Sequence, residues 1–204
     1  MTGNDVTASA AALAGESQPA PDGRRRRSQQ SRDRIIAAML ALVEEGAITP
    51  SAEDVAARAG VGLRSVFRHF NDMESLYGEM AVRLAGLYEH GLAPFASSDW
   101  RGRMAEMTDR RVGIFERLLP FKRAADAHRH ESATIAAQHD AVLALLRTRL
   151  LAVLPAEIAG DAPRVEALDM LLSADSWARL RLQQRLDPAA ARAVLDRLLA
   201  PLLA

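Results

Sequence analysis

The chain has 204 residues, of which 49% are hydrophobic and 25% charged, and this balance excludes a wholly disordered protein. Lysine and arginine number 26, as do aspartate and glutamate, so the overall charge gives no information about partners until it is divided by segment. The chain has no cysteine, which excludes disulfides, thiol catalysis and cysteine-based zinc or iron–sulfur sites.

The composition predicts an all-α fold. The sequence holds 40 alanines and 27 leucines but only 5 Phe, 2 Trp and 2 Tyr. Alanine and leucine favour helices, whereas the aromatic and β-branched residues that favour strands are sparse.

The N-terminus reads as a disordered arm that ends in arginines, over residues 1–27. Residues 1–23 are rich in Ala, Ser, Gly and Pro and show no sustained apolar period. Residues 24–34 then carry six arginines against one acid, Asp33, a net charge of +5. This segment is either a solvated arm or an electrostatic anchor for phosphates or an anionic membrane surface.

The apolar stretch 35–43 (IIAAMLALV) could imitate the core of an export signal after those arginines. Glu44 and Glu45 follow at once, however, and no Ala-x-Ala cleavage site lies nearby. The same residues fit one face of an amphipathic helix. No apolar run approaches the ~20 residues that cross a bilayer. We therefore expect a cytoplasmic protein without a membrane partner.

Capping residues divide the next segment into short helices. Gly46 ends the first helix, and Ser51 with Asp54 forms a capping box that opens a helix over 52–58. Gly60 and Gly62 interrupt the chain before a helix over 63–70. Asn71 or Asp72 then caps a longer helix that runs towards Leu92.

The remaining chain is predicted to be helical over about 100–119, 121–130, 132–154 and 163–186, with Pro120 and Pro155 as breaks. Asp187 and Pro188 begin a last helix that runs to about residue 203.

Residues 51–76 predict a helix-turn-helix, because two short helices are joined by a tight turn that contains glycine. The second helix of such a pair lies in the major groove of DNA. Its polar side offers Arg64, Ser65, Arg68 and His69, and arginine can bind guanine edges or phosphate in two places. At helical spacing, Phe67 and Phe70 are predicted to be core residues rather than wedges between bases.

The spaced residues of this segment resemble the tetracycline-repressor (TetR) family of transcriptional regulators. The matching groups are Val55-Ala56-x-x-Ala59-Gly60-Val61, Ser65-x-Phe67-x-x-Phe70 and Glu74-x-Leu76. The resemblance implies an N-terminal three-helix helix-turn-helix domain over 28–76 and a larger helical effector-binding and dimerisation domain over 77–204. It also implies a sequence-specific repressor that a small molecule releases, and neither an enzyme nor a cofactor-dependent protein.

By this resemblance, residues at the start of the second helix and on the recognition helix contact DNA. The predicted DNA-binding residues are Arg32, Ser51, Leu63, Arg64, Ser65, Phe67, Arg68 and His69. Three residues depart from the family pattern: Gly62 replaces a serine, Phe67 a tyrosine and Met73 a lysine. The arginines of residues 24–34 could offset the phosphate contacts that these changes remove.

The segment 163–186 is apolar on more than one side, which predicts burial on two sides. With the apolar stripe of 188–203, it predicts a two-fold homodimer with a four-helix interface; the alternative is one thick monomeric core. A homodimer would bind a pseudo-palindromic operator in double-stranded DNA. The predicted effector pocket comprises Met104, Met107, Phe115, Phe121, His139, Met170, Asp175 and Trp177.

Two other classes of function remain open. His128, His130 and His139 could belong to a helical metal-dependent hydrolase, although two histidines two apart on a helix point in very different directions. The arginine arm could instead make the chain a basic interaction module. We predict no metal site and no catalytic residue.

Overall fold

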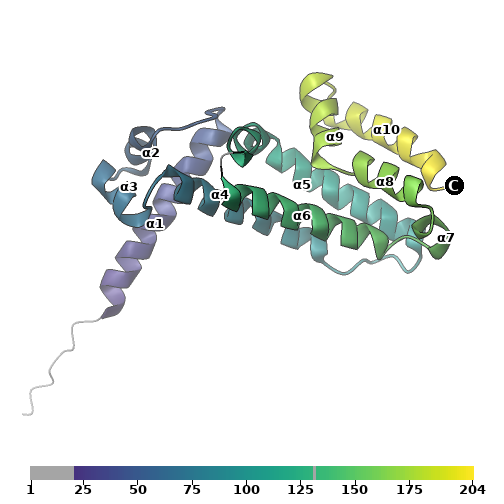
Figure 1. The fold of residues 1–204 in the computed structure, drawn as a ribbon, viewed down its shortest axis with the longest axis horizontal. Coiled ribbons are helices and arrows are strands. Elements are labelled where there is room, and N and C mark those ends of the chain that lie inside the picture. Colours follow the sequence, from purple (N-terminus) through teal and green to yellow (C-terminus); the bar gives the residue numbers. More distant parts are fainter. Residues whose placement is uncertain (1–20, 131) are drawn as a thin grey trace, which may run out of the picture.

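The computed structural model describes residues 21–130 and 132–204, so most of the predicted N-terminal arm (1–20) lies outside the described residues. Every regular element within the described ranges is a helix, which confirms the all-α prediction. Figure 1 shows an elongated molecule, with helices α1 to α3 at one end and the C-terminus at the other.

The N-terminal helices are α1 (Pro21–Glu44), α2 (Ala52–Ala59) and α3 (Leu63–His69), and they pack on the start of α4 (Met73–Glu89). Their buried core includes Ile36, Met39, Val55 and Leu76. Helix α1 begins earlier than the sequence indicates, since arginines 24–27 form part of its first turns. Proline at a first helical position and a following run of arginine and glutamine both favour such an extension.

Local capping signals place the turn between α2 and α3. The predicted capping box of Ser51 and Asp54 is present, and Asp72 caps α4 by accepting the Ser75 N–H at 2.7 Å. Gly60 ends α2 with φ +65°, a left-handed conformation that glycine adopts without steric cost.

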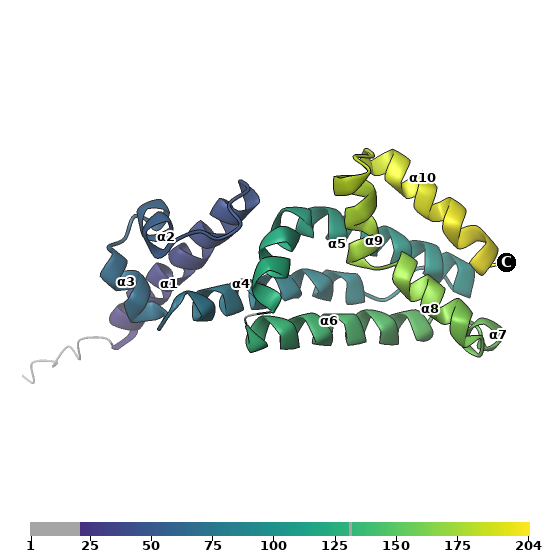
Figure 2. The same ribbon diagram turned by 45° about the horizontal axis from the view of Figure 1, so that its top comes forward.

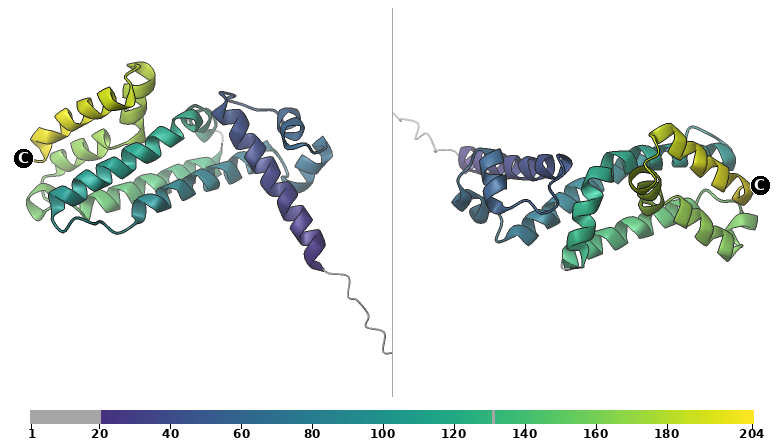
Figure 3. Two further views of the ribbon diagram at one scale, coloured as in Figure 1. Left: turned by 180° about the vertical axis from the view of Figure 1, so that it is seen from behind. Right: turned by 90° about the horizontal axis from the view of Figure 1, so that it is seen from above.

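The C-terminal part begins with α4, which ends in a short 3-10 turn, η1 (His90–Leu92). Helices α4, α5 (Trp100–Arg129) and α6 (Ala133–Leu151) lie against one another, as Figure 2 shows. A short α7 (Ala156–Ala159) leads to α8 (Ala162–Leu171), α9 (Ala174–Ala178) and α10 (Pro188–Leu199). These helices form a layer on the α5–α6 pair, in which α9 packs on α5, α8 on α6, and α10 on α8. Figure 3 shows this covering layer from behind and from above.

Two predicted helix boundaries are wrong. Pro120 lies inside a continuous α5 rather than between two helices. Its ring is exposed, and the buried side chains of Leu119 and Phe121 on either side hold the helix together. The predicted helix 163–186 is broken after Leu171, because the Ser173 hydroxyl accepts the Ser176 N–H at 3.1 Å and starts α9.

Two hydrophobic cores meet along α5 and α6. The C-terminal core includes Phe115, Leu150, Leu168 and Trp177. The N-terminal core takes Phe121 and Ala124 from α5 and Ile135 from α6. Helix α4 runs through the predicted domain boundary at residue 76, and Leu76, Tyr77 and Met80 all belong to the N-terminal core. The two parts of the chain therefore share packed helices.

Within the described ranges, no helix is both long enough and apolar enough to cross a bilayer.

Candidate nucleic-acid interface and ligand pocket

Helix α3 presents two stripes of side chains to solvent. Leu63 and Phe67, four residues apart, are 38% and 45% exposed and form an apolar stripe. Arg64 and Arg68 are exposed beside it at the same spacing and form a basic stripe. The prediction that Phe67 belongs to the core is wrong. Helix α3 buries Val66, and Phe67, the next residue, points about 100° away from it. Phe70, which is also buried, follows the helix as its C-cap in an extended conformation.

Arg64 and Arg68 take part in none of the ion pairs found among the described residues, unlike Arg32 and Arg58 of the same end of the molecule. Their guanidinium groups therefore keep their donors for an external partner. A planar guanidinium can donate two hydrogen bonds to a guanine edge or a phosphate. This pair is the strongest nucleic-acid-binding feature of α3.

His69 lies at the C-terminal end of α3 and is half-buried. Its Nε2 is buried and has no hydrogen-bond partner in the described part of the chain. Burial, and then the charges of Arg68 and Arg32, lower the pKa of His69 below its usual 6.5. The ring is therefore neutral at pH 7 and adds no charge to this surface.

Arg32 and Ser51 are already engaged within the protein. The Arg32 guanidinium donates to the Glu79 carboxylate at 2.8 Å and lies 4.9 Å from the centre of the Phe70 ring, so it ties α1 to α4. The same hydrogen bond holds the pKa of Glu79 below its usual value. The Ser51 hydroxyl donates to the Asp54 carboxylate at 2.7 Å and caps α2. Ser65 is half-buried on α3.

A cavity of about 150 Å³ opens between α4, α5, α6 and α9. Its wall includes residues of both cores, such as Phe121 and Ile135 from the N-terminal core and Phe115 from the C-terminal core. The lining residues are Ala81, Leu84, Ala85, Tyr88, Phe115, Leu118, Leu119, Phe121, Lys122, Ala125, Asp126, Ile135, Gln138, His139, Val142, Leu143, Leu146, Ala174 and Asp175.

Four of the eight residues predicted for the effector pocket line this cavity: Phe115, Phe121, His139 and Asp175. The other four lie elsewhere. Met104, Met107 and Trp177 are packed in the C-terminal core, and the Trp177 indole donates to the Glu116 carboxylate at 2.9 Å. Met170 is 62% exposed on α8.

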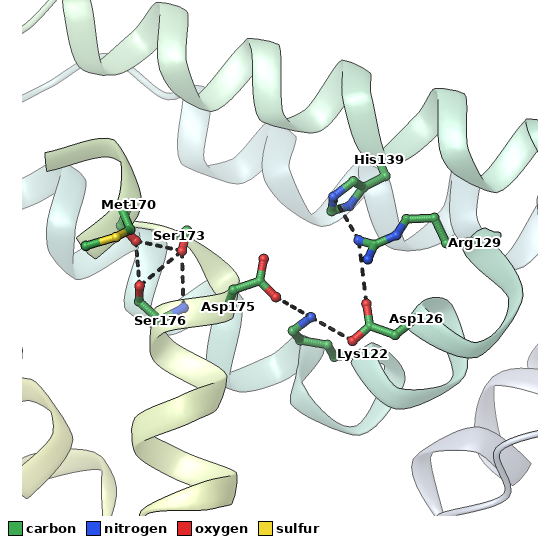
Figure 4. Close-up of polar contacts among 8 residues, drawn as sticks. All are labelled: Lys122, Asp126, Arg129, His139, Met170, Ser173, Asp175 and Ser176. Atoms are coloured by element: carbon green, nitrogen blue, oxygen red, sulfur yellow. Dashed lines mark hydrogen bonds and ion pairs between the residues drawn. The ribbon is translucent and has the colours of Figure 1, made fainter. Parts of the chain in front are cut away.

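The polar end of the cavity is a chain of charged side chains (Figure 4). Lys122 Nζ lies 2.6 Å from an Asp175 oxygen and 2.8 Å from an Asp126 oxygen, and so links α5 to α9. Arg129 lies 3.6 Å from Asp126 and 3.1 Å from the His139 Nε2. Burial, followed by the charge of Arg129, lowers the pKa of His139.

Sequence reasoning missed Lys122, Gln138 and Tyr88 as pocket residues. Of these three, only Lys122 stands out in the sequence, because it is the single lysine among 26 lysine and arginine residues. Gln138 and Tyr88 look like ordinary helix residues, and only the packing of α4 against α6 brings them to one cavity.

The three histidines considered for a metal site have separate surroundings. The His128 ring stacks on Tyr77 with centroids 3.8 Å apart, His130 is exposed, and His139 faces Arg129. Within residues 21–130 and 132–204, no group of three or more His, Asp or Glu side chains has a geometry that could hold a metal ion.

Solved structures with the same fold include regulators of transcription and a multidrug-binding protein. A TetR-family transcriptional regulator from Streptomyces coelicolor has a TM-score of 0.65 at 19% identity, over 85% of this chain and 79% of the other. NalD of Pseudomonas aeruginosa, the secondary repressor of the MexAB-OprM multidrug efflux pump, has a TM-score of 0.55 at 19% sequence identity, and the match covers 87% of this chain and 95% of NalD. The multidrug-binding protein EbrR, solved with imidazole, has a TM-score of 0.54 at 20% sequence identity, and the match covers 90% of this chain and 95% of EbrR.

No sequence model of a protein family matches the chain, and no curated protein matches it. At these identities, the solved structures show that the chain has the fold of TetR-family regulators.

Proposed function

We propose that the chain is a TetR-family transcriptional regulator that binds a specific DNA sequence and is released from it by a small molecule. The observation that carries this proposal is the exposed face of α3, where Arg64 and Arg68 stand without ion-pair partners among the described residues. The regulators that share the fold support it, and one of them is described as a repressor. A cytoplasmic location and the absence of an enzymatic activity are parts of the same proposal.

In this proposal α3 enters the major groove. Arg64 and Arg68 bind base edges or phosphates, while Leu63 and Phe67 contact apolar parts of the bases, such as thymine methyl groups. The arginines at 24–27, exposed on the first turns of α1, add phosphate contacts outside the helix-turn-helix. They would offset the contacts that the tyrosine and lysine of the family pattern would supply.

The cavity supports a route from the effector to the DNA-binding end. Phe121 and Ile135 line the cavity and also pack in the N-terminal core, which holds α1, α2 and α3 together. A ligand that displaces these side chains would favour one arrangement of that core over another. The difference in ligand affinity between the two arrangements sets the size of the response.

A homodimer is the second part of the proposal, and α10 supports it. Ala191, Leu195 and Leu199 of α10 are buried in the C-terminal core, whereas Val194 and Leu198 on the neighbouring stripe are 37% and 47% exposed. An exposed apolar stripe beside a buried one is typical of a helix that packs on a partner. Two copies joined here would bind half-sites whose centres are about 34–36 Å, or a multiple of that, apart.

Leu198→Asp is expected to weaken the dimer at least about 100-fold, because each dimer would bury two unpaired carboxylates. Analytical ultracentrifugation should show the wild type at twice the 22.1 kDa of the chain and the variant at the monomer mass. Val82→Asp, at an exposed apolar position of α4, is the matched control and should stay dimeric. A Leu198→Asp protein that remains dimeric would place the interface elsewhere.

The proposed function is tested by fluorescence anisotropy of the purified chain on DNA from upstream of its own gene, across a salt series. We expect tighter binding to this DNA than to a scrambled sequence of the same composition at every salt concentration. Equal affinities with a steep salt dependence would indicate phosphate attraction alone and contradict sequence-specific regulation through that DNA.

A further inference from the structure

Apart from its charged end and Gln138 of α6, the cavity has apolar walls. Leucine, alanine, valine, phenylalanine and isoleucine side chains from α4, α5 and α6 supply most of the lining. Tyr88 adds a ring from α4, and burial raises the pKa of its hydroxyl to about 12, so this group is uncharged at neutral pH. The body of a ligand must therefore be apolar.

The charged groups at the polar end already neutralise one another. Asp175, Lys122, Asp126 and Arg129 form an alternating chain of two negative and two positive side chains. Lys122 is held by two carboxylates, within 2.8 Å of each, and its side chain is only 19% exposed. A charged ligand would bring an uncompensated charge into an apolar space, which is costly.

His139 supplies a hydrogen-bond donor at the polar end of the cavity, in addition to the Tyr88 hydroxyl and the Gln138 amide elsewhere in its wall. Its Nε2 lies 3.1 Å from Arg129 Nη1, and a guanidinium can only donate, so this Nε2 must be an unprotonated acceptor. The proton of the neutral ring is then on Nδ1. That N–H is the donor that the ring keeps for a ligand with an acceptor oxygen or nitrogen. Figure 4 shows His139 above the ion-pair chain, with one ring nitrogen directed to Arg129.

The volume of the cavity limits the size of the part of a ligand that it can bury. A protein cavity of about 150 Å³ accepts benzene. We propose that the effector cavity takes an uncharged, mainly apolar molecule whose buried part is about one ring in size and carries a hydrogen-bond acceptor directed at His139. This proposal rests on the proposed function only in calling the ligand an effector; the binding itself is a property of the cavity.

Four single-ring probes of similar size test the ligand class: acetophenone, ethylbenzene, benzoate and benzylammonium. Binding to the full-length protein at pH 7.5 is measured by ligand-observed NMR titration. We expect acetophenone to bind at least tenfold more tightly than either charged probe. Benzoate or benzylammonium binding as tightly as acetophenone would overturn the proposal, and so would the absence of binding by all four.

Two pairs of variants locate the binding. His139→Ala should weaken acetophenone binding about tenfold and ethylbenzene binding less than twofold, because only acetophenone has an acceptor. His130→Ala, at an exposed histidine, is its control.

Ala125→Leu fills the cavity and should weaken the binding of both uncharged probes at least tenfold, whereas Ala127→Leu, exposed on the same helix, should not. An equal loss of both probes in His139→Ala, or unchanged binding in Ala125→Leu, would contradict the proposed pose.

The same protein preparations are also tested for DNA binding by anisotropy. Probe binding as expected without specific DNA binding would leave the ligand class intact and contradict the regulatory function. Specific DNA binding with a preference for a charged probe would support the regulatory function and contradict the proposed ligand class.

Discussion

Replacing Arg64 or Arg68 with alanine is expected to weaken specific DNA binding by about 1–3 kcal/mol for each change, roughly 5- to 160-fold. Both side chains are exposed on α3, and neither is in an ion pair within the described residues, so their loss removes contacts with DNA and little else. Anisotropy titrations on specific and scrambled DNA measure the effect. The discrimination between the two sequences should fall together with the affinity where the arginine reads a base, and should stay unchanged where it binds a phosphate.

Lysine replacements separate the two kinds of contact. A lysine keeps the charge but cannot form the bidentate pair with a guanine edge. Arg64→Lys or Arg68→Lys should therefore retain affinity where the arginine binds phosphate and lose discrimination where it reads a base. Arg117→Ala, an exposed arginine of α5, is the matched control. Unchanged DNA affinity in both alanine variants would contradict the assignment of α3 as the recognition helix.

Arg111→Met is expected to lower the free energy of unfolding by about 2–4 kcal/mol. Arg111 is only 4% exposed, and its guanidinium donates to the main-chain oxygen of Leu172 at 3.1 Å and to that of Leu146. Burial lowers its pKa to about 10, so it remains charged at neutral pH. Methionine fills a similar space but leaves both carbonyl oxygens without these donors, which is the source of the loss.

Urea denaturation followed by circular dichroism measures this difference. Arg117→Met is the control on the same helix, and it should change the stability by less than about 0.5 kcal/mol because the side chain is exposed. An Arg111→Met protein as stable as the wild type would mean that water or rearranged side chains satisfy the two carbonyls. It would then exclude Arg111 as the residue that fastens α6 and α8 to α5.

The sequence predicted best those features that depend on a few neighbouring residues. The capping box of Ser51 and Asp54, the left-handed Gly60 and the cap at Asp72 all depend on local hydrogen bonds or local sterics. They fix the ends of α2 and the start of α4 whatever packs against these helices. The helix-turn-helix was therefore accessible without a structure.

Features set by tertiary packing were harder to predict. Phe67 and Phe70 are both aromatic and three residues apart, yet only Phe70 is buried, because α3 ends at His69 and the chain is extended at Phe70. The same difficulty affects methionine and tryptophan in the C-terminal helices. Met104 and Phe115 fit an apolar pocket equally well by residue type, but only Phe115 reaches the cavity. The interior position of Arg111 has no local signal at all.

The shared packing at α5 and α6 has a consequence for engineering chimeric regulators. A junction at residue 76 or 92 would separate the DNA-binding helices from Phe121, Ala124 and Ile135. These three side chains complete the N-terminal core in which those helices pack. A host protein would have to offer side chains of matching shape at those places, or the transplanted module would carry an open apolar surface. Grafts that also transfer the α5 and α6 segments spanning 118–135 keep this contact intact. The transferable unit is therefore discontinuous in sequence.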